Sequence, residues 1–97
     1  MKISESQLLL LKNYFRDKPV FKAYLFGSYV RDEADSFSDV DILVELDYSK
    51  QIGLQFVQMK IDLEHLLHSK VDLVSSNALS TYIQPLVDRE KQLIYAR

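Results

Sequence analysis

The sequence contains no cysteine. This absence excludes a disulfide framework, a thiolate metal site and a cysteine nucleophile, and it suits a reducing compartment. Long hydrophobic runs are also missing, because the apolar runs cover only a few residues whereas a membrane span needs ~18 or more. The N-terminal residues do not follow the pattern of a signal peptide. We therefore expect a cytoplasmic protein without a membrane partner.

The charged residues show little excess of one sign. Twelve Lys and Arg face fourteen Asp and Glu, which gives a formal net charge of −2 at pH 7. A broad cationic surface, on which sequence-independent nucleic-acid binding mostly depends, is therefore not expected. The 97 residues are 47% hydrophobic, which is enough for one modest core. We expect a single domain over residues 1–97.

Hydrophobic periodicity predicts helices that alternate with strands. Ser4 and Gln7 form a capping-box pattern, so the first helix should begin at this point. Helices are predicted over 4–16, 52–68 and 85–91, short helical segments over 29–34 and 78–82, and strands over 20–26, 39–46, 71–74 and 93–95. This order indicates an α/β (α+β) fold in which helices cover a small sheet of three to four strands. Periodicity alone does not fix the order of the strands.

Two aspartates stand out in the predicted strand 39–46. Asp39 and Asp41 are two residues apart, so their carboxylates leave the same face, about 7 Å apart at the backbone, and can reach one cation. Mg²⁺ prefers such oxygen ligands. Asp72, in a neighbouring apolar segment, would complete a two-metal site if its strand lies beside the first. The alternative is that all three aspartates are ordinary residues at exposed strand ends.

A possible anion site precedes these aspartates. Gly27 ends a predicted strand and Ser28 opens a turn, an arrangement in which backbone N–H groups and a hydroxyl can contact phosphate. An ordinary turn explains the same pair. Arg31 would add positive charge to this site, or would instead pair with Asp35. Ser38 would either line the site or cap a turn.

The segment from Gly27 to Asp41 reads GSYVRDEADSFSDVD, and it resembles the signature G-S-x(9)-S-D-x-D of the DNA polymerase β-type nucleotidyltransferase superfamily. The short length, the stretch KVDLVS around Asp72 and the tail QPLVDREKQLIY are similar to the minimal nucleotidyltransferases, which are encoded beside HEPN-domain proteins. The resemblance covers nearly the whole chain and is strongest from Gly27 to Leu46.

The resemblance implies a nucleotidyltransferase palm with a small mixed sheet. Gly27 and Ser28 would hold the nucleoside triphosphate, with Arg31 and Ser38 beside them. Three aspartates would be the catalytic and metal-binding residues: Asp39, Asp41 and Asp72. The cofactor would be Mg²⁺, with two ions, and the substrate ATP. Asp72 would activate the attacking hydroxyl.

Two residues depart from the pattern of the family. Val30 and Asp32 occupy places where many relatives carry alanine and glycine. Because an inward anion at position 32 would weaken triphosphate binding, we expect Asp32 to face solvent.

The resemblance implies that the chain transfers AMP from ATP to a hydroxyl, a tyrosine, of a partner HEPN toxin and is the antitoxin of that pair. An acceptor site completed by the partner suits the short chain. One alternative is a binding antitoxin that neutralises its partner by occlusion, and another is transfer to a small molecule. The sequence leaves open the nucleotide preference, the choice between Mg²⁺ and Mn²⁺, and assembly into a homo- or hetero-oligomer.

Overall fold

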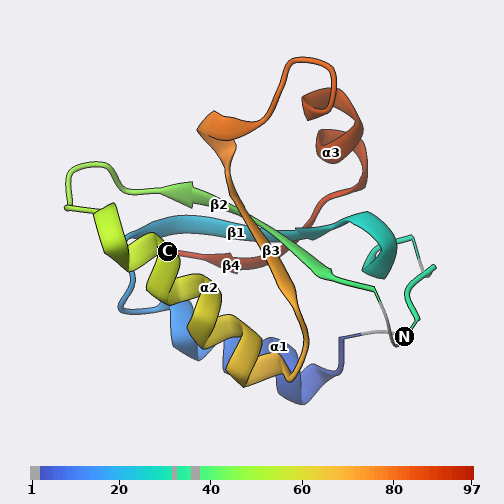
Figure 1. Cartoon of the computed structure of the whole chain (residues 1–97), viewed down its shortest axis with the longest axis horizontal. Coiled ribbons are helices and arrows are strands. Elements are labelled where there is room, and N and C mark those ends of the chain that lie inside the picture. The colour runs from blue at the N-terminus through green and yellow to red at the C-terminus, as the bar shows by residue number, and fades with distance from the viewer. Residues whose placement is uncertain (1–2, 32, 36–37) are drawn as a thin grey trace.

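The protein is described by a computed structural model that covers residues 3–31, 33–35 and 38–97. Its helices and strands follow one another in this order: α1 (Glu5–Phe15), β1 (Val20–Phe26), the 3₁₀ turn η1 (Gly27–Tyr29), β2 (Val40–Leu46), α2 (Gly53–Leu67), β3 (Val71–Ser75), the 3₁₀ turn η2 (Ser76–Ala78), α3 (Gln84–Glu90) and β4 (Gln92–Ala96). Figure 1 shows their arrangement. The longer predicted elements are confirmed to within two residues at each end.

Helix α1 begins with the predicted capping box. The Gln7 N–H donates to Ser4 Oγ at 3.1 Å, and the Ser4 N–H donates to Gln7 Oε1 at 2.9 Å. Two N–H groups that have no partner inside the helix are satisfied in this way. The helix ends before Pro19, whose preceding residue disfavours helical geometry.

The four strands form one mixed sheet in the order β3-β2-β1-β4. β1 pairs with β2 and with β4 in antiparallel fashion, whereas β2 and β3 are parallel. The parallel pair requires a crossover connection, which α2 supplies. The mixed α/β fold predicted from the sequence is therefore confirmed, and β2 becomes a central strand with β3 beside it.

One face of the sheet carries the main hydrophobic core. Helices α1 and α2 both cover this face, whereas α3 lies on the other side of the sheet (Figure 1). The alternation in β2 explains the division, because Val40, Ile42 and Val44 are buried in the core while Asp41 points to the opposite face. The side chains that build the core from the helices are Leu11, Phe15, Met59, Leu63 and Leu67.

Two short helical predictions are wrong. Instead of a helix over 29–34, the described residues contain the turn η1, which begins at Gly27 because the Val30 and Arg31 N–H groups both donate to the Gly27 carbonyl. Instead of a helical turn over 78–82, η2 follows β3 directly. Single turns depend on one or two hydrogen bonds, so hydrophobic periodicity does not locate them.

None of the helices in the described part of the chain combines the length and the hydropathy of a membrane span.

Candidate functional site

The register of the parallel strands makes Asp41 and Asp72 direct neighbours. Asp41 on β2 is paired with Asp72 on β3, between the core pairs Val40 with Val71 and Ile42 with Leu73. Both aspartates therefore point away from the core, toward the other face of the sheet. Asp39 immediately precedes β2 and is exposed. The condition set from the sequence, that the strand of Asp72 lies beside the strand of Asp41, is met.

Asp41 lies in a cluster of like charges. It is partly buried, and burial raises the pKa of its carboxyl group to about 6, with further contributions from Asp72 and then Asp39. The positive charge of Arg31 acts in the opposite direction. Removal from water and neighbouring anions both disfavour a charged carboxylate. This position therefore favours a bound proton or a bound cation.

Gly27 holds its backbone against the carboxylate of Asp41. The preceding residue, Phe26, is the strand partner of Asp41, so the turn η1 begins directly beside that side chain. Gly27 has a φ of +79°, and a Cβ atom at this position would collide with Asp41 Oδ2. Only glycine combines this backbone conformation with so close an approach. The glycine of the Gly-Ser motif thus shapes the surroundings of the central aspartate.

Arg31 is paired with two glutamates. Its Nε donates to Glu33 Oε2 at 3.2 Å, and its Nη1 donates to Glu90 Oε1 and Oε2 at 3.1 and 2.9 Å. The sequence suggested Asp35 as an alternative partner of Arg31, whereas the ion pairs of Arg31 in the structure are with Glu33 and Glu90. Ser28 is partly buried, and its hydroxyl has no hydrogen-bond partner among the described residues. That hydroxyl is available to a ligand.

Glu90 is the residue that the sequence analysis missed. Besides binding Arg31, its Oε1 accepts the Gly27 N–H at 2.9 Å. Glu90 lies 63 positions from Gly27 and ends α3, on a segment that carried no chemical prediction. The tail QPLVDREKQLIY, which contains Glu90, was part of the family resemblance, but periodicity does not distinguish an acidic residue at the end of a helix from an ordinary exposed residue.

Ser38 and Val30 have no contact with the aspartates of the candidate site among the hydrogen bonds and core contacts of the described residues. The Asp35 N–H donates to Ser38 Oγ at 3.0 Å, and this hydroxyl in turn donates to Asp35 Oδ1 at 3.3 Å. These bonds favour the capping alternative for Ser38. Val30 is partly buried and packs against the core. Asp32, which was expected to face solvent, lies outside the described residues.

The aspartates supply oxygen atoms that suit a metal ion, but they do not form a complete set of ligands by themselves. Within residues 3–31, 33–35 and 38–97, no group of three His, Cys, Asp or Glu side chains is arranged to hold a metal ion. Carboxylate oxygens are nevertheless the ligands that Mg²⁺ takes, usually one or two together with waters and substrate phosphates. Asp41 and Asp72 are neighbours and their negative charges repel each other, which a bound cation would relieve. The pair therefore fits the oxygen ligands that Mg²⁺ takes.

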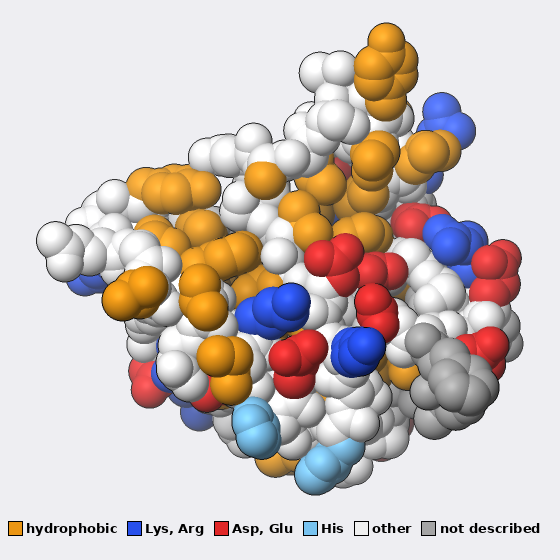
Figure 2. All heavy atoms as spheres, in the orientation of Figure 1, with side chains coloured by type: hydrophobic (Ala, Val, Ile, Leu, Met, Phe, Trp, Pro, Cys, Tyr) orange, Lys and Arg blue, Asp and Glu red, His pale blue; other side chains and the backbone are white. Residues whose placement is uncertain are grey.

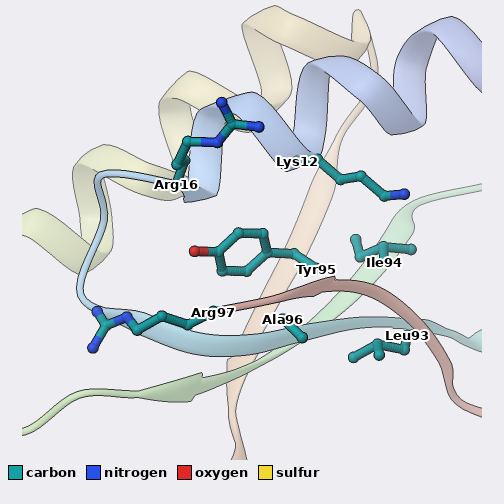
Figure 3. A pocket seen from close by; sticks show the side chains of 7 residues that line it. All are labelled: Lys12, Arg16, Leu93, Ile94, Tyr95, Ala96 and Arg97. Carbon is teal, nitrogen blue, oxygen red and sulfur yellow. The ribbon is translucent and has the colours of Figure 1, made fainter.

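A cavity of about 570 Å³ lies elsewhere, between α1 and β4 (Figure 3). Its lining is Lys12, Arg16, Leu93, Ile94, Tyr95, Ala96 and Arg97. None of these is a site residue predicted from the sequence. The aspartates of the candidate site therefore lie outside this cavity. Figure 2 shows acidic side chains gathered on one face of the molecule.

Comparison with known proteins places the chain in a family. The family model for polymerase beta, nucleotidyltransferase, matches residues 10–97. The protein adenylyltransferase MntA of Thermococcus cleftensis is 41% identical over 87 residues, which are 89% of this chain and 87% of that protein. A crystal structure of a toxin–antitoxin with AMP-PNP aligns with a TM-score of 0.74 at 22% identity, covering 97% of this chain and 75% of the other.

A second solved structure contains the tri-AMPylated HEPN toxin of Shewanella oneidensis in complex with its MNT antitoxin. It aligns with a TM-score of 0.72 at 23% identity, covering 96% of this chain and 72% of the other. At these identities, the two structures establish the fold. The family match and the MntA relative show that this chain belongs to the polymerase beta nucleotidyltransferase family.

Proposed function

We propose that this chain transfers AMP from ATP to a tyrosine hydroxyl of a HEPN-domain toxin, and that it acts as the antitoxin of that partner. The observation that carries the proposal is the pair of Asp41 and Asp72 held beside the Gly27 turn. Two relatives support it: MntA is a protein adenylyltransferase, and the Shewanella antitoxin is bound to a toxin that carries AMP.

The turn at Gly27 and Ser28 is the proposed binding site for the triphosphate. The Ser28 hydroxyl has no partner among the described residues, and the guanidinium of Arg31 lies close enough to Asp41 to affect its pKa. A hydroxyl and a fixed guanidinium are suitable donors for phosphate oxygens. Ser38, whose hydroxyl is bonded to Asp35, contributes to the turn before β2.

Asp39, Asp41 and Asp72 are the proposed ligands of two Mg²⁺ ions. When bound, these ions would lower the pKa of the acceptor hydroxyl and balance the charge of the phosphates. In the reaction, the hydroxyl oxygen forms a bond to the α-phosphorus of ATP, the bond to pyrophosphate breaks, and Asp72 accepts the hydroxyl proton. Asp72 suits this role because it is exposed at the sheet edge, whereas Asp41 is partly buried.

A protein acceptor agrees with the surface around the site. Tyr82, Ile83 and Leu86 are 90%, 51% and 59% exposed, and they precede Glu90 along the same segment. In Figure 2, hydrophobic side chains lie beside the acidic group on the face in view. Exposed apolar side chains gathered in one place are typical of protein–protein contacts. This surface supports a protein partner, in preference to a small molecule.

The proposal is tested by the intact mass of the HEPN-domain partner after incubation with this chain, ATP and Mg²⁺. The wild type should add one or more AMP groups, and the variant Asp39→Asn/Asp41→Asn should add none. A matched control, Asp17→Asn/Asp88→Asn, changes two aspartates that are ion-paired outside the site. It should behave as the wild type does. A tight complex without any mass gain would contradict transfer and would establish neutralisation by occlusion.

A further inference from the structure

The carboxylate of Glu90 connects the last turn of α3 to the candidate site. One oxygen, Oε1, receives both the Gly27 N–H at 2.9 Å and Arg31 Nη1 at 3.1 Å, while Oε2 receives Nη1 at 2.9 Å. The side chain of Glu90 is only 22% exposed, compared with 47% for Arg31. Charge-assisted bonds of this kind are stronger than neutral ones. A single side chain thus holds two donors that belong to the Gly27–Arg31 turn.

These contacts fix the guanidinium of Arg31 in one orientation. Glu90 holds Nη1 and Glu33 holds Nε, so two of the three nitrogens of a planar group are bound. Nη2 has no hydrogen bond to the described residues, and neither has the Ser28 hydroxyl. Glu90 therefore orients the guanidinium of Arg31 and leaves its Nη2 available to a ligand.

The position of Glu90 is itself fixed. It follows the buried Val87, which is 2% exposed, and it is separated by one residue from β4, which pairs with β1. The backbone of Glu90 is therefore held between α3 and β4, and its carboxylate is held at the turn by the Gly27 N–H and Arg31 Nη1. This placement favours a Glu90 carboxylate that keeps its contacts with Gly27 and Arg31 when ATP binds, over one that is displaced by a phosphate group.

We propose that Glu90 is a positioning residue for the nucleotide: it holds Arg31 and the Gly27 turn so that Nη2 of Arg31 and the Ser28 hydroxyl face the phosphates of ATP. This inference rests on the function proposed above. It assigns to the end of α3 a role in shaping the Gly27 turn, whose residues Gly27 and Arg31 lie 63 and 59 positions earlier in the chain.

The test is the dissociation constant of the ATP analogue AMP-PNP with Mg²⁺, measured by calorimetry. Glu90→Ala should weaken binding ~10-fold or more, the usual loss for a charge-assisted contact. Arg31→Ala should weaken it similarly, and Glu90→Ala should cost less in the Arg31→Ala background than in the wild type, because only the contact with the Gly27 N–H then remains to be lost. Asp88→Ala removes another anion of α3, which is paired with Lys91, and should leave affinity unchanged.

Glu90→Gln keeps an acceptor for the Gly27 N–H but loses the charge that binds Arg31, so its affinity should fall between wild type and Glu90→Ala. This conservative variant also carries the test if Glu90→Ala does not fold. Equal or tighter binding by folded Glu90 variants would overturn the inference, and tighter binding would identify Glu90 as a competitor of phosphate. Absence of binding by the wild type would overturn both this inference and the proposed nucleotide site.

Discussion

Gly27 and Asp41 are in close contact in the candidate site. A Cβ atom on residue 27 would meet Asp41 Oδ2, and the φ of +79° adds a backbone penalty for any residue with a side chain. We predict that Gly27→Ala lowers the free energy of unfolding by about 1–3 kcal/mol and abolishes AMP transfer. Urea denaturation and the mass of the partner measure the two effects. Gly53→Ala is the control, because its Cβ would meet nothing within 4 Å although its φ is also positive. Equal transfer by both variants would contradict this account.

Asp41 should make the stability of the metal-free protein depend on pH. Its folded pKa is about 6, compared with an ordinary value of 3.8, so the folded state binds more protons than the unfolded state between these values. The free energy of unfolding should therefore fall as the pH rises from about 4 to about 6. Above pH 6, Asp41→Asn should be more stable than the wild type by roughly 1 kcal/mol, after allowance for solvent screening.

Denaturation in EDTA at pH 4 and pH 7 measures this difference. Addition of Mg²⁺ at pH 7 should stabilise the wild type and leave Asp41→Asn unchanged, because a ligand stabilises the state that binds it. A pH dependence that is the same in both proteins would show that Asp41 is not the titrating group.

At the scale of single elements, α1 depends on its first turn. Ser4→Ala removes the acceptor of the Gln7 N–H and should lower the free energy of unfolding by about 1 kcal/mol. Asn13→Ala is a suitable control in the same helix, because Asn13 is exposed and has no side-chain partner among the described residues. It should change stability little. Thermal or urea denaturation distinguishes them, and an equal effect of the two variants would refute the importance of the capping box.

The elements differ in how far the sequence could predict them. Strand β1 and helix α2 follow from apolar periodicity, which is a local property of the chain. The turns η1 and η2 were misplaced because each depends on only one or two hydrogen bonds, which hydrophobic periodicity does not locate. The motif from Gly27 to Asp41 located the site, but the pairing of Arg31 with Glu90 joins residues 59 positions apart and has no local signal. Strand order likewise required the structure, which alone made Asp72 a neighbour of Asp41.

At the scale of the whole molecule, residue Arg97 ties β4 to the far end of β2. Its Nη1 donates to Asp47 Oδ2 at 2.8 Å, its N–H donates to the Phe21 carbonyl at 2.8 Å, and its guanidinium lies over the Phe21 ring. The Arg97 hydrogen bond, followed by those from Ser49, lowers the pKa of Asp47 to about 2. This depressed pKa contributes stability above pH 4 that is lost as the pH falls toward 2.

Arg97→Ala should therefore lower the melting temperature at pH 7, and its difference from the wild type should shrink as the pH falls from about 4 to about 2. Arg16→Ala is the matched control, because Arg16 is exposed and has no ion pair with the described residues. Melting curves at pH 7 and at about pH 2 test this. A difference in melting temperature between Arg97→Ala and the wild type that does not change with pH would exclude the ion pair with Asp47 as its cause.

The sheet as a whole serves the site by bringing Asp41, Asp72 and the Gly27 turn to one face, opposite α1 and α2. The central claim is that this arrangement transfers a nucleotide. The most direct measurement incubates the chain and its HEPN-domain partner with ATP that carries a radiolabel on either the α- or the γ-phosphorus. We predict that the partner keeps the α-label and that the γ-label leaves with pyrophosphate. Retention of the γ-label, or of neither label by a partner that binds the chain, would contradict the claim.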